Sequence, residues 1–167
     1  MPLPAWKKSR LPIMMKLCCE VLTALKGKTL VTAESLTGGG IGAALTAVPG
    51  SSAVYKGGVI SYTNWVKEKV LGVPGEILEQ YGAVSMQTAG YMASGVRKLL
   101  QADAAVSVTG LAGPGGDEFG NPVGTVFIGY CDEKICLSRK YLFSGSREEI
   151  RTAAIREALL LVLEQNT

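Results

Sequence analysis

The segment Thr29–Leu45 constrains the fold more than any other part of the sequence. It begins with an apolar β-branched run, continues through a turn rich in hydroxyl groups and glycine, and ends with Gly, Ala and Leu at helical spacing. This order predicts a buried strand that leads directly into a helix. Such a turn places the Ser35 hydroxyl at the carboxyl end of a strand, before backbone N–H groups that stabilise an anion or oxyanion. We expect a ligand site here, with Thr37, Gly38 and Gly39 supplying the N–H groups.

Two other interpretations of this turn compete with a catalytic one. In a purely structural interpretation, Ser35 or Thr37 caps the helix, and the glycines allow the helix to pack closely on the sheet. In the other, residues 38–43 fit the Gly-x-Gly-x-x-Ala pattern of a dinucleotide site. That pattern requires an acidic residue on the following strand to hold a ribose, and residues 59–64 contain none. The sequence therefore argues against a dinucleotide site and leaves the structural interpretation open.

The absence of histidine limits the chemistry that this chain can perform. None of its 167 residues is histidine, which excludes Ser-His-Asp triads, Cys-His pairs and histidine metal ligands. Acid–base catalysis would have to use Lys, Tyr, Glu, Asp or Cys side chains. No cluster of Cys, Asp or Glu has the spacing of metal ligands, so we expect neither a metal nor another cofactor.

Size and charge indicate one domain without a nucleic-acid partner. A chain with 47% hydrophobic residues and this length can bury one core, which we expect over residues 13–167 after a flexible segment at residues 1–12. The net charge is only +3, and the densest basic stretch is residues 7–10. The first twelve residues lack the apolar region of a signal peptide, and no apolar run is long enough to span a membrane. We expect a cytoplasmic protein with no membrane partner.

The four cysteines form no Cys-x-x-Cys pair. Cys18 and Cys19 fall within a helical pattern, where a thiol behaves as a small buried apolar group. Cys131 and Cys136 flank an expected hairpin and are able to approach each other. Reduced thiols are the simpler expectation for an intracellular chain, and a functional disulfide is the less favoured alternative.

Strands and helices are expected to alternate along most of the chain. Apolar spacing, capping residues and turn signals predict strands over residues 29–33, 59–63, 104–109, 125–131 and 135–143. They predict helices over residues 13–25, 41–45, 65–71, 76–81, 85–100 and from Ser146 onward, where Glu149 completes a capping box. One hairpin among alternating elements indicates a three-layer α/β/α sandwich around a mixed, mostly parallel sheet. The long irregular segment at residues 110–124 is of the kind that usually carries function.

Lys67 is the best candidate for a base that activates Ser35. It follows the polar end of a second strand, and Trp65 and Val66 precede it, so its amine can be partly desolvated and neutral. If the two strands are neighbours, their carboxyl ends open on the same edge, and Tyr62 can orient the lysine or relay a proton. The alternative is a solvated helix residue beside two other charged residues.

Arg147 is the candidate for binding an anion. It lies in the first turn of the last helix, where a cation opposes the helix dipole, so an arginine there is explained best by an anionic ligand. A phosphate group fits the two-pronged guanidinium. The alternative is a surface arginine paired with Glu148 or Asp117.

Six sequence blocks resemble one known family. The segments that carry the resemblance, in order, are residues 33–39 (Ala-Glu-Ser-Leu-Thr-Gly-Gly), 57–67 (Gly-Gly-Val-Ile-Ser-Tyr-Thr-Asn-x-x-Lys), 71–73, 82–85, 109–116 (Thr-Gly-x-Ala-Gly-Pro-Gly-Gly) and 122–126. Together they are similar to the C-terminal domain of the competence/damage-inducible protein CinA, the nicotinamide-nucleotide amidohydrolase family. The resemblance extends over about residues 13 to 165 and follows the family order.

The resemblance implies hydrolysis of the carboxamide of nicotinamide mononucleotide to nicotinic acid mononucleotide and ammonia, without a metal, in pyridine-nucleotide recycling. By position it implies that Ser35 is the nucleophile, Lys67 the base and Tyr62 a catalytic helper. Thr109, with Gly110 beside it, and Arg147 fall at substrate-binding positions of the family.

Two departures from the family pattern are visible. Leu36 stands where a cysteine is usual, and Trp65-Val66 replaces the usual Glu-Ala before the lysine, which bears on substrate preference. Many relatives carry an additional N-terminal pyrophosphatase-like domain that is not in this sequence. The family also implies a homodimer or larger homo-oligomer. A non-catalytic nucleotide-binding module that regulates a partner is the alternative function.

Overall fold

A single five-stranded sheet forms the centre of the protein. The computed structural model describes residues 12–167, so residues 1–11 of the expected flexible segment lie outside the described residues. The strands follow the order β2-β1-β3-β4-β5 across the sheet. Their bounds are Leu30–Glu34 for β1, Tyr55–Ile60 for β2, Ala104–Gly110 for β3, Thr125–Cys131 for β4 and Cys136–Leu142 for β5.

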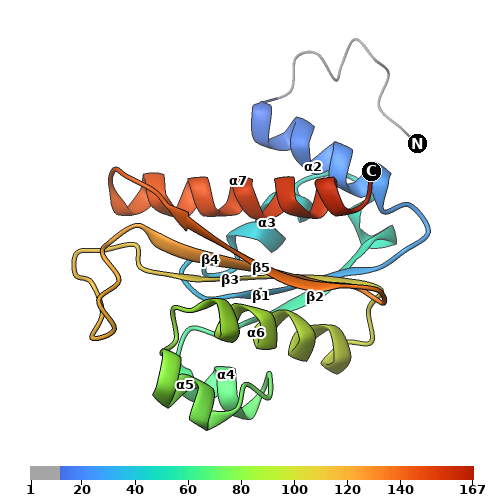
Figure 1. Cartoon of the computed structure of the whole chain (residues 1–167). Helices are drawn as coiled ribbons and strands as arrows, with labels where there is room; N and C mark the ends of the chain where they lie inside the picture. Colours follow the sequence, from blue (N-terminus) through green and yellow to red (C-terminus); the bar gives the residue numbers. More distant parts are fainter. Residues whose placement is uncertain (1–11) are drawn as a thin grey trace.

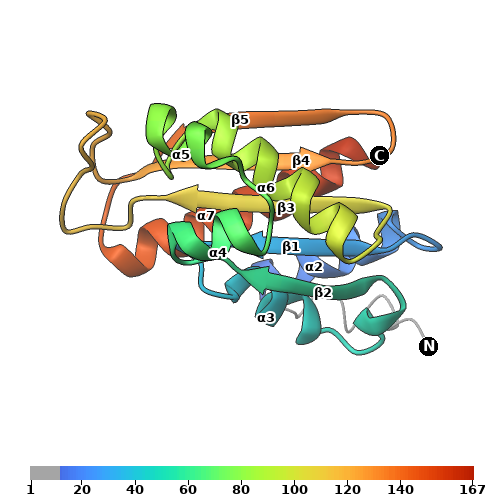
Figure 2. The same ribbon diagram turned by 90° about the horizontal axis from the view of Figure 1, so that it is seen from below.

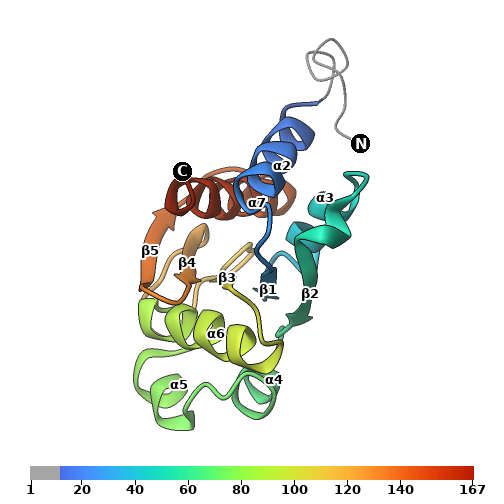
Figure 3. The same cartoon turned by 90° about the vertical axis from the view of Figure 1, so that its right-hand side faces the viewer.

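Helices cover both faces of this sheet (Figures 1 and 3). Helices α2, α3 and α7 lie on one face, and α6 covers the other, with α4 and α5 beyond it. Their bounds are Ile13–Ala24 for α2, Gly40–Thr46 for α3, Asn64–Lys69 for α4, Gly75–Tyr81 for α5, Met86–Leu99 for α6 and Arg147–Gln165 for α7, with a short 3₁₀ turn η1 at Ser51–Ala53. The predicted three-layer α/β/α architecture is confirmed.

The strand directions agree with the expected mixed sheet. Strand β1 pairs in parallel with both β2 and β3, whereas β4 is antiparallel to β3 and to β5. Strands β2, β1, β3 and β5 therefore run in one direction and only β4 is reversed. The register of β2 shifts at Lys56, directly before its paired glycines, and a Cβ at Gly58 would overlap Thr32 of β1.

Two apolar clusters fill the spaces between the layers. The larger cluster packs α2, α3 and α7 against one face of the sheet, around fully buried side chains such as Leu25, Ile41 and Leu159. The smaller one packs α6 against the other face, around Met92 and Val96. Each face of β1 and β3 is thus covered, which explains why both strands read as continuous apolar runs.

The parallel strands bring their carboxyl ends to one edge of the molecule (Figure 2). The loop at residues 110–124 and the start of α7 lie at the same edge. The side-chain amide of Asn121 anchors this loop by donating to the Val84 carbonyl at 3.1 Å. This edge therefore combines five separate chain segments, which is the usual position of a ligand site in an open α/β sheet.

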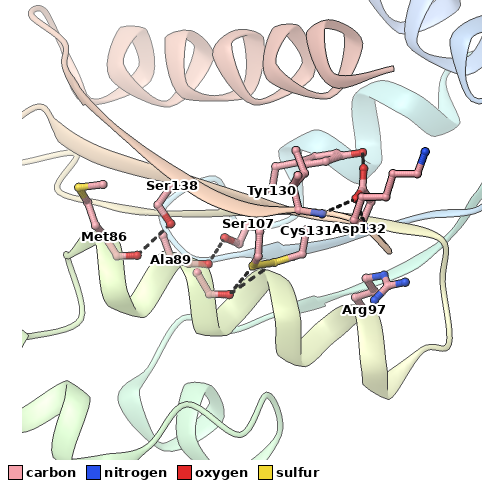
Figure 4. The surroundings of a disulfide bond; sticks show 12 residues. Met86, Ala89, Arg97, Ser107, Tyr130, Cys131, Asp132 and Ser138 are labelled. Carbon is pink, nitrogen blue, oxygen red and sulfur yellow. Dashed lines mark hydrogen bonds between the residues drawn. A yellow bond between two sulfur atoms is a disulfide. The ribbon is translucent and has the colours of Figure 1, made fainter. Parts of the chain in front are cut away.

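The hairpin of β4 and β5 contains a disulfide that the sequence did not favour. Cys131 and Cys136 are directly opposed in the antiparallel ladder, with Cα atoms 4.1 Å apart, and the structure joins them (Figure 4). The expectation of four reduced thiols therefore holds only for Cys18 and Cys19. Near the disulfide, α6 is bound to the sheet by hydroxyl groups, since Ser107 donates to the Ala89 carbonyl at 2.6 Å.

Two glycines within α6 provide a test of this packing. A Cβ at Gly95 would overlap the Leu71 carbonyl oxygen, whereas a Cβ at Gly90 would lie 3.4 Å from the nearest atom, Ser138 Oγ. We expect Gly95→Ala to lower the free energy of unfolding by about 1–3 kcal/mol, despite the higher helix propensity of alanine. Gly90→Ala, the matched control, should leave it unchanged or raise it by up to about 1 kcal/mol. Urea unfolding measures both, and equal effects would contradict the close approach of α6 to Leu71.

Candidate active site

A cavity of about 340 Å³ lies at the edge where the parallel strands end. Most of the site residues expected from the sequence border it, namely Ser35, Tyr62, Lys67, Thr109, Gly110 and Arg147. The predicted donors Thr37, Gly38 and Gly39 are not among its lining residues. The fold thus brings six of these nine residues together around one space.

Ser35 and Lys67 form the central contact of the cavity. Lys67 Nζ lies 3.1 Å from Ser35 Oγ and donates to the Ser61 carbonyl oxygen at 2.7 Å. The Lys67 side chain is buried, with 1% of the residue exposed, and Ser35 is 7% exposed. The alternative of a solvated helix lysine is therefore wrong. The amine is placed within reach of the serine proton.

Burial determines the charge state of this amine. Removal of Lys67 from water lowers its pKa from 10.5 to about 8, because desolvation disfavours the ammonium form. In the described part of the chain, the ion pairs are Lys69–Glu68, Arg139–Glu164 and Arg156–Glu157, so no carboxylate counteracts this effect at Lys67. A lysine with this pKa is neutral in about a tenth of the molecules at pH 7 and in about half at pH 8, which makes a neutral general base available.

The segment after β2 explains why Lys67 points inward. Thr63 caps α4, and its Oγ1 accepts from the Val66 N–H at 3.4 Å. The N–H of Ser61 donates to the Glu34 carbonyl at 2.9 Å, which extends the β1–β2 pairing by one residue. Helix α4 therefore starts at a fixed position beside the end of β1, and its lysine reaches Ser35.

Neither Ser35 nor Thr37 caps the helix that follows the turn. The N-cap of α3 is Gly39 in a left-handed conformation, without a side-chain hydrogen bond. Instead the buried carboxylate of Glu34 accepts from the Ile41 N–H at 2.8 Å, and also from the Thr37 hydroxyl at 2.7 Å. The structural interpretation of the two hydroxyl residues as caps is therefore wrong, and the Ser35 hydroxyl remains available to Lys67.

The backbone donors of the turn differ from those expected. The Gly38 N–H is used within the turn, because it donates to the Ser35 carbonyl at 3.0 Å. The Leu36 N–H donates no hydrogen bond within the described part of the chain, and Leu36 borders the cavity. The N–H groups of Thr37 and Gly39 also donate no hydrogen bond within the described residues, but of these three residues only Leu36 borders the cavity. The first N–H after the nucleophile position is therefore the donor best placed for an oxyanion, as in other turns that present a nucleophilic serine.

Arg147 and Tyr62 also border the cavity. The Arg147 guanidinium donates to the Gly113 carbonyl at 2.5 Å and reaches the Tyr62 hydroxyl at 3.4 Å. The predicted alternative, a pair with Glu148 or Asp117, is absent from the described ion pairs. Arg147 is largely exposed and keeps part of its guanidinium open to solvent.

Thr109 has a structural bond in addition to its place at the cavity. Its hydroxyl donates to the Ala83 carbonyl at 2.7 Å and so links the end of β3 to the segment before α6. Gly110 has no room for a side chain, since a Cβ would approach the Thr125 carbonyl at 2.7 Å. These two residues shape the cavity wall more than they present polar groups to it.

Neither a metal centre nor a spanning helix is present in the described residues. No group of three or more Cys, Asp or Glu residues there is arranged to hold a metal ion. Among the helices of residues 12–167, none has the length and apolar character needed to cross a membrane.

The comparisons with known proteins settle the family. The family model described as the CinA C-terminal domain matches residues 14–166. This chain belongs to the CinA C-terminal domain family. It is 50% identical over 135 residues to a CinA-like protein of Endomicrobium trichonymphae, an alignment that covers 81% of this chain and 32% of the relative. It is 44% identical over 137 residues to a putative competence-damage inducible protein of Desulforudis audaxviator, covering 82% and 33%. The chain therefore spans about a third of the length of these curated relatives.

Solved CinA structures have the same fold. The crystal structure of the competence/damage inducible protein CihA from Agrobacterium tumefaciens superposes with a TM-score of 0.90 at 38% identity and covers 100% of both chains. The competence damage-inducible protein A from Klebsiella pneumoniae gives a TM-score of 0.88 at 38% identity, with 91% of this chain and 96% of that chain covered. The resemblance stated from the sequence blocks is confirmed.

Sequence reasoning missed two parts of this CinA-family site. It assigned no role to Glu34, although an acidic residue between a buried strand and a glycine turn is a signal for a carboxylate that accepts from a helix N-terminus. It also did not consider the Leu36 N–H, because the periodicity of a sequence does not reveal which residues of a turn border a cavity.

The buried amine makes stability depend on pH. The pKa of Lys67 is about 8 in the folded state and close to 10.5 in the unfolded state. At pH values between these two pKa values, the unfolded chain binds one proton more than the folded chain. The free energy of unfolding of the wild type, relative to Lys67→Met, should therefore rise with pH from about 8 to 10, by up to about 3 kcal/mol. Chemical unfolding of both proteins at several pH values measures this difference. A difference that does not change with pH would contradict a depressed lysine pKa.

Proposed function

We propose that this CinA-family domain hydrolyses the carboxamide of nicotinamide mononucleotide to nicotinic acid mononucleotide and ammonia. The observation that carries the proposal is the buried Lys67 amine, 3.1 Å from Ser35 Oγ and without a carboxylate partner among the described residues. A neutral amine beside a serine hydroxyl is a nucleophile–base pair that requires neither histidine nor a metal. The family resemblance supplies the substrate class.

The reaction follows from the positions of the groups. Neutral Lys67 takes the proton from Ser35, whose oxygen attacks the carboxamide carbon, and the Leu36 N–H donates to the resulting oxyanion. As the C–N bond breaks, the Lys67 ammonium returns the proton to the leaving nitrogen, which departs as ammonia. Water, deprotonated by Lys67, then attacks the Ser35 ester. As the ester bond breaks, the Lys67 ammonium returns the proton to Ser35 Oγ, and the carboxylic acid is released. Atoms and protons balance over the two steps.

The cavity suits a small nucleotide with an anionic end. Its volume of about 340 Å³ is at the lower end of the range for small-molecule sites. Ser35, Lys67 and the exposed Arg147 all border it. We assign Arg147 to the 5′-phosphate, and Tyr62, which Arg147 contacts, to orienting the substrate. The carboxamide would then face the serine.

The further parts of the proposal follow from family resemblance. The reaction would take place in the cytoplasm, within pyridine-nucleotide recycling and without a cofactor, in a homodimer or larger homo-oligomer. The alternative function is a non-catalytic module that binds the nucleotide and regulates a partner. Ammonia release from nicotinamide mononucleotide by the purified protein distinguishes the two, since a regulatory module would bind the nucleotide without consuming it.

Replacement of the nucleophile tests the proposal directly. Ser35→Ala should reduce ammonia release by more than about 10³-fold, because no other hydroxyl takes its place, while the melting temperature stays close to that of the wild type. Ser51→Ala, which removes another buried serine hydroxyl outside the cavity, is the control and should keep full activity. Near-normal turnover by Ser35→Ala would reject this serine as the nucleophile.

The charge state of Lys67 should appear in the pH profile. Because only the neutral amine accepts the serine proton, kcat/KM should rise about tenfold per pH unit and level off above an apparent pKa of about 8. Lys67→Met should lower the plateau by about 10²- to 10⁴-fold. Initial rates of ammonia release between pH 6 and 10 give the profile. A rate that falls as pH rises through 8 would require a protonated lysine and a different mechanism.

The role of Arg147 can be separated from that of the reacting groups. Arg147→Ala should raise the transition-state free energy for nicotinamide mononucleotide by about 2–4 kcal/mol, because the phosphate loses its charged partner. This change is measured as a lower kcat/KM. The dephosphorylated riboside serves as the control substrate, since it offers nothing for the arginine to bind. Comparable losses with both substrates would place Arg147 at the carboxamide or in the scaffold instead.

A further inference from the structure

A second arginine of α7 holds the turn that carries Ser35. Arg151 lies one helical turn after Arg147 and is half-buried. Its Nε donates to the Leu36 carbonyl at 2.9 Å, and its Nη2 donates to the Thr37 carbonyl at 3.2 Å. A single guanidinium therefore binds two consecutive carbonyl oxygens directly after Ser35.

Arg151 has no ionic partner that would explain its position. The ion pairs within residues 12–167 do not include it, and it is not among the residues that line the cavity. Hydrogen bonds from a cation are about twice as strong as those between neutral groups, and the planar fork of arginine fixes two acceptors in one geometry. Both bonds are made to the turn and neither to a substrate position.

Glu34 holds the same turn from its other side. Its carboxylate accepts from the Thr37 hydroxyl and from the N–H groups of Ile41 and Gly42, at distances from 2.7 to 3.1 Å. The turn between Ser35 and α3 thus has a cation on its carbonyl groups and an anion on its Thr37 hydroxyl and on the first N–H groups of α3. A glycine lies at the point of contact, where a Cβ at Gly38 would be 3.7 Å from Arg151 Nη2.

We propose that Arg151 is a positioning residue that holds the backbone around Leu36 so that the Leu36 N–H points to the oxyanion formed at Ser35. The proposal rests on the proposed hydrolysis and deepens it. Leu36 is the residue whose carbonyl Arg151 binds and whose own N–H is free within the described part of the chain. The Leu36 N–H belongs to the peptide group before its Cα, and the bound carbonyl belongs to the peptide group after it. Arg151 therefore acts on the N–H by limiting rotation about the two backbone bonds at the Leu36 Cα. Preorganised donors of this kind stabilise a transition state without reorganisation during the reaction.

This role differs from that of Arg147, although both residues lie on one face of α7. Arg147 borders the cavity and reaches Tyr62, so its loss should depend on the phosphate of the substrate. Arg151 acts through the backbone at the reacting end, so its loss should affect every substrate that forms an oxyanion there. The two arginines therefore predict different substrate dependence, which makes the proposal testable.

The experiment compares Arg151→Met and Arg151→Lys with the wild type at a temperature where all three are folded. Arg151→Met should lower kcat for nicotinamide mononucleotide by about 10- to 100-fold, as a misplaced catalytic group does, with KM within about threefold. The loss with the riboside should be the same. Arg151→Lys keeps the charge but not the fork, and should recover part of kcat. The matched control is Arg156→Met on the same helix. Arg156 is exposed and pairs with Glu157, so this variant should keep full activity.

A second readout does not depend on the identity of the substrate. An alkyl fluorophosphonate reacts with an activated serine, and its phosphoryl oxygen occupies the position of the oxyanion. Intact-mass spectrometry should show labelling of Ser35 in the wild type and labelling that is about 10- to 100-fold slower in Arg151→Met. If the wild type releases no ammonia but is labelled, the proposed substrate fails and the role of Arg151 is still decided by the labelling rates.

Three results would overturn the role of Arg151. The first is an unchanged kcat and labelling rate in folded Arg151→Met, which would leave only a structural function. The second is a loss confined to KM. The third is a loss with the mononucleotide but not with the riboside, which would make Arg151 a phosphate ligand. A variant that only melts at a lower temperature and is fully active when folded gives the first of these results.

Discussion

The buried contact between Lys67 and Ser35 is the interaction on which the rest of the site depends. Burial of an amine is unfavourable for its charged form, and here it lowers the pKa of Lys67 to about 8. The same burial that weakens the ammonium form makes the neutral base available. Only two oxygen atoms of the described chain lie within hydrogen-bond distance of Lys67 Nζ, the hydroxyl of Ser35 and the carbonyl of Ser61. A nearby carboxylate would stabilise the ammonium and remove this property.

The sheet topology meets this requirement because β1 and β2 are parallel neighbours. Ser35 follows β1 directly, and Lys67 follows β2 after one short connection capped by Thr63. The third parallel strand, β3, ends at Thr109 and Gly110, which also border the cavity. Helix α7 completes the edge with its first turns. The three parallel strands contribute to the site at their carboxyl ends, as is typical of open α/β sheets.

Much of this arrangement was predictable from local sequence patterns. The strand and glycine turn of Thr29–Leu45 predicted where Ser35 lies, and the capping box predicted that Ser146 precedes α7, where its Oγ accepts from the Glu149 N–H. The proximity of Ser35 and Lys67 required only that their strands be neighbours. These features depend on backbone periodicity and on capping chemistry, both of which are encoded over a few residues.

The parts that were not predictable depend on contacts between distant segments. Arg151 binds carbonyl groups more than a hundred positions earlier in the chain, with sequence separations of 115 and 114 residues. The Glu34 carboxylate and the free Leu36 N–H follow from how one turn is folded in three dimensions. The Cys131–Cys136 disulfide follows from the exact register of a hairpin, which the sequence located only approximately. The periodicity of apolar residues predicts individual helices and strands, whereas these bonds join one segment to another.

The most direct test of the central claim is the titration of Lys67 itself. Lysine labelled with ¹³C at Cε gives one NMR signal per side chain, and Lys67→Met identifies the signal of Lys67. The account predicts that this signal titrates with a midpoint of about 8, while the exposed lysines titrate near their usual value of about 10.4. A Lys67 midpoint at or above that of the exposed lysines would show a stable ammonium in the folded protein and would contradict its role as the base for Ser35.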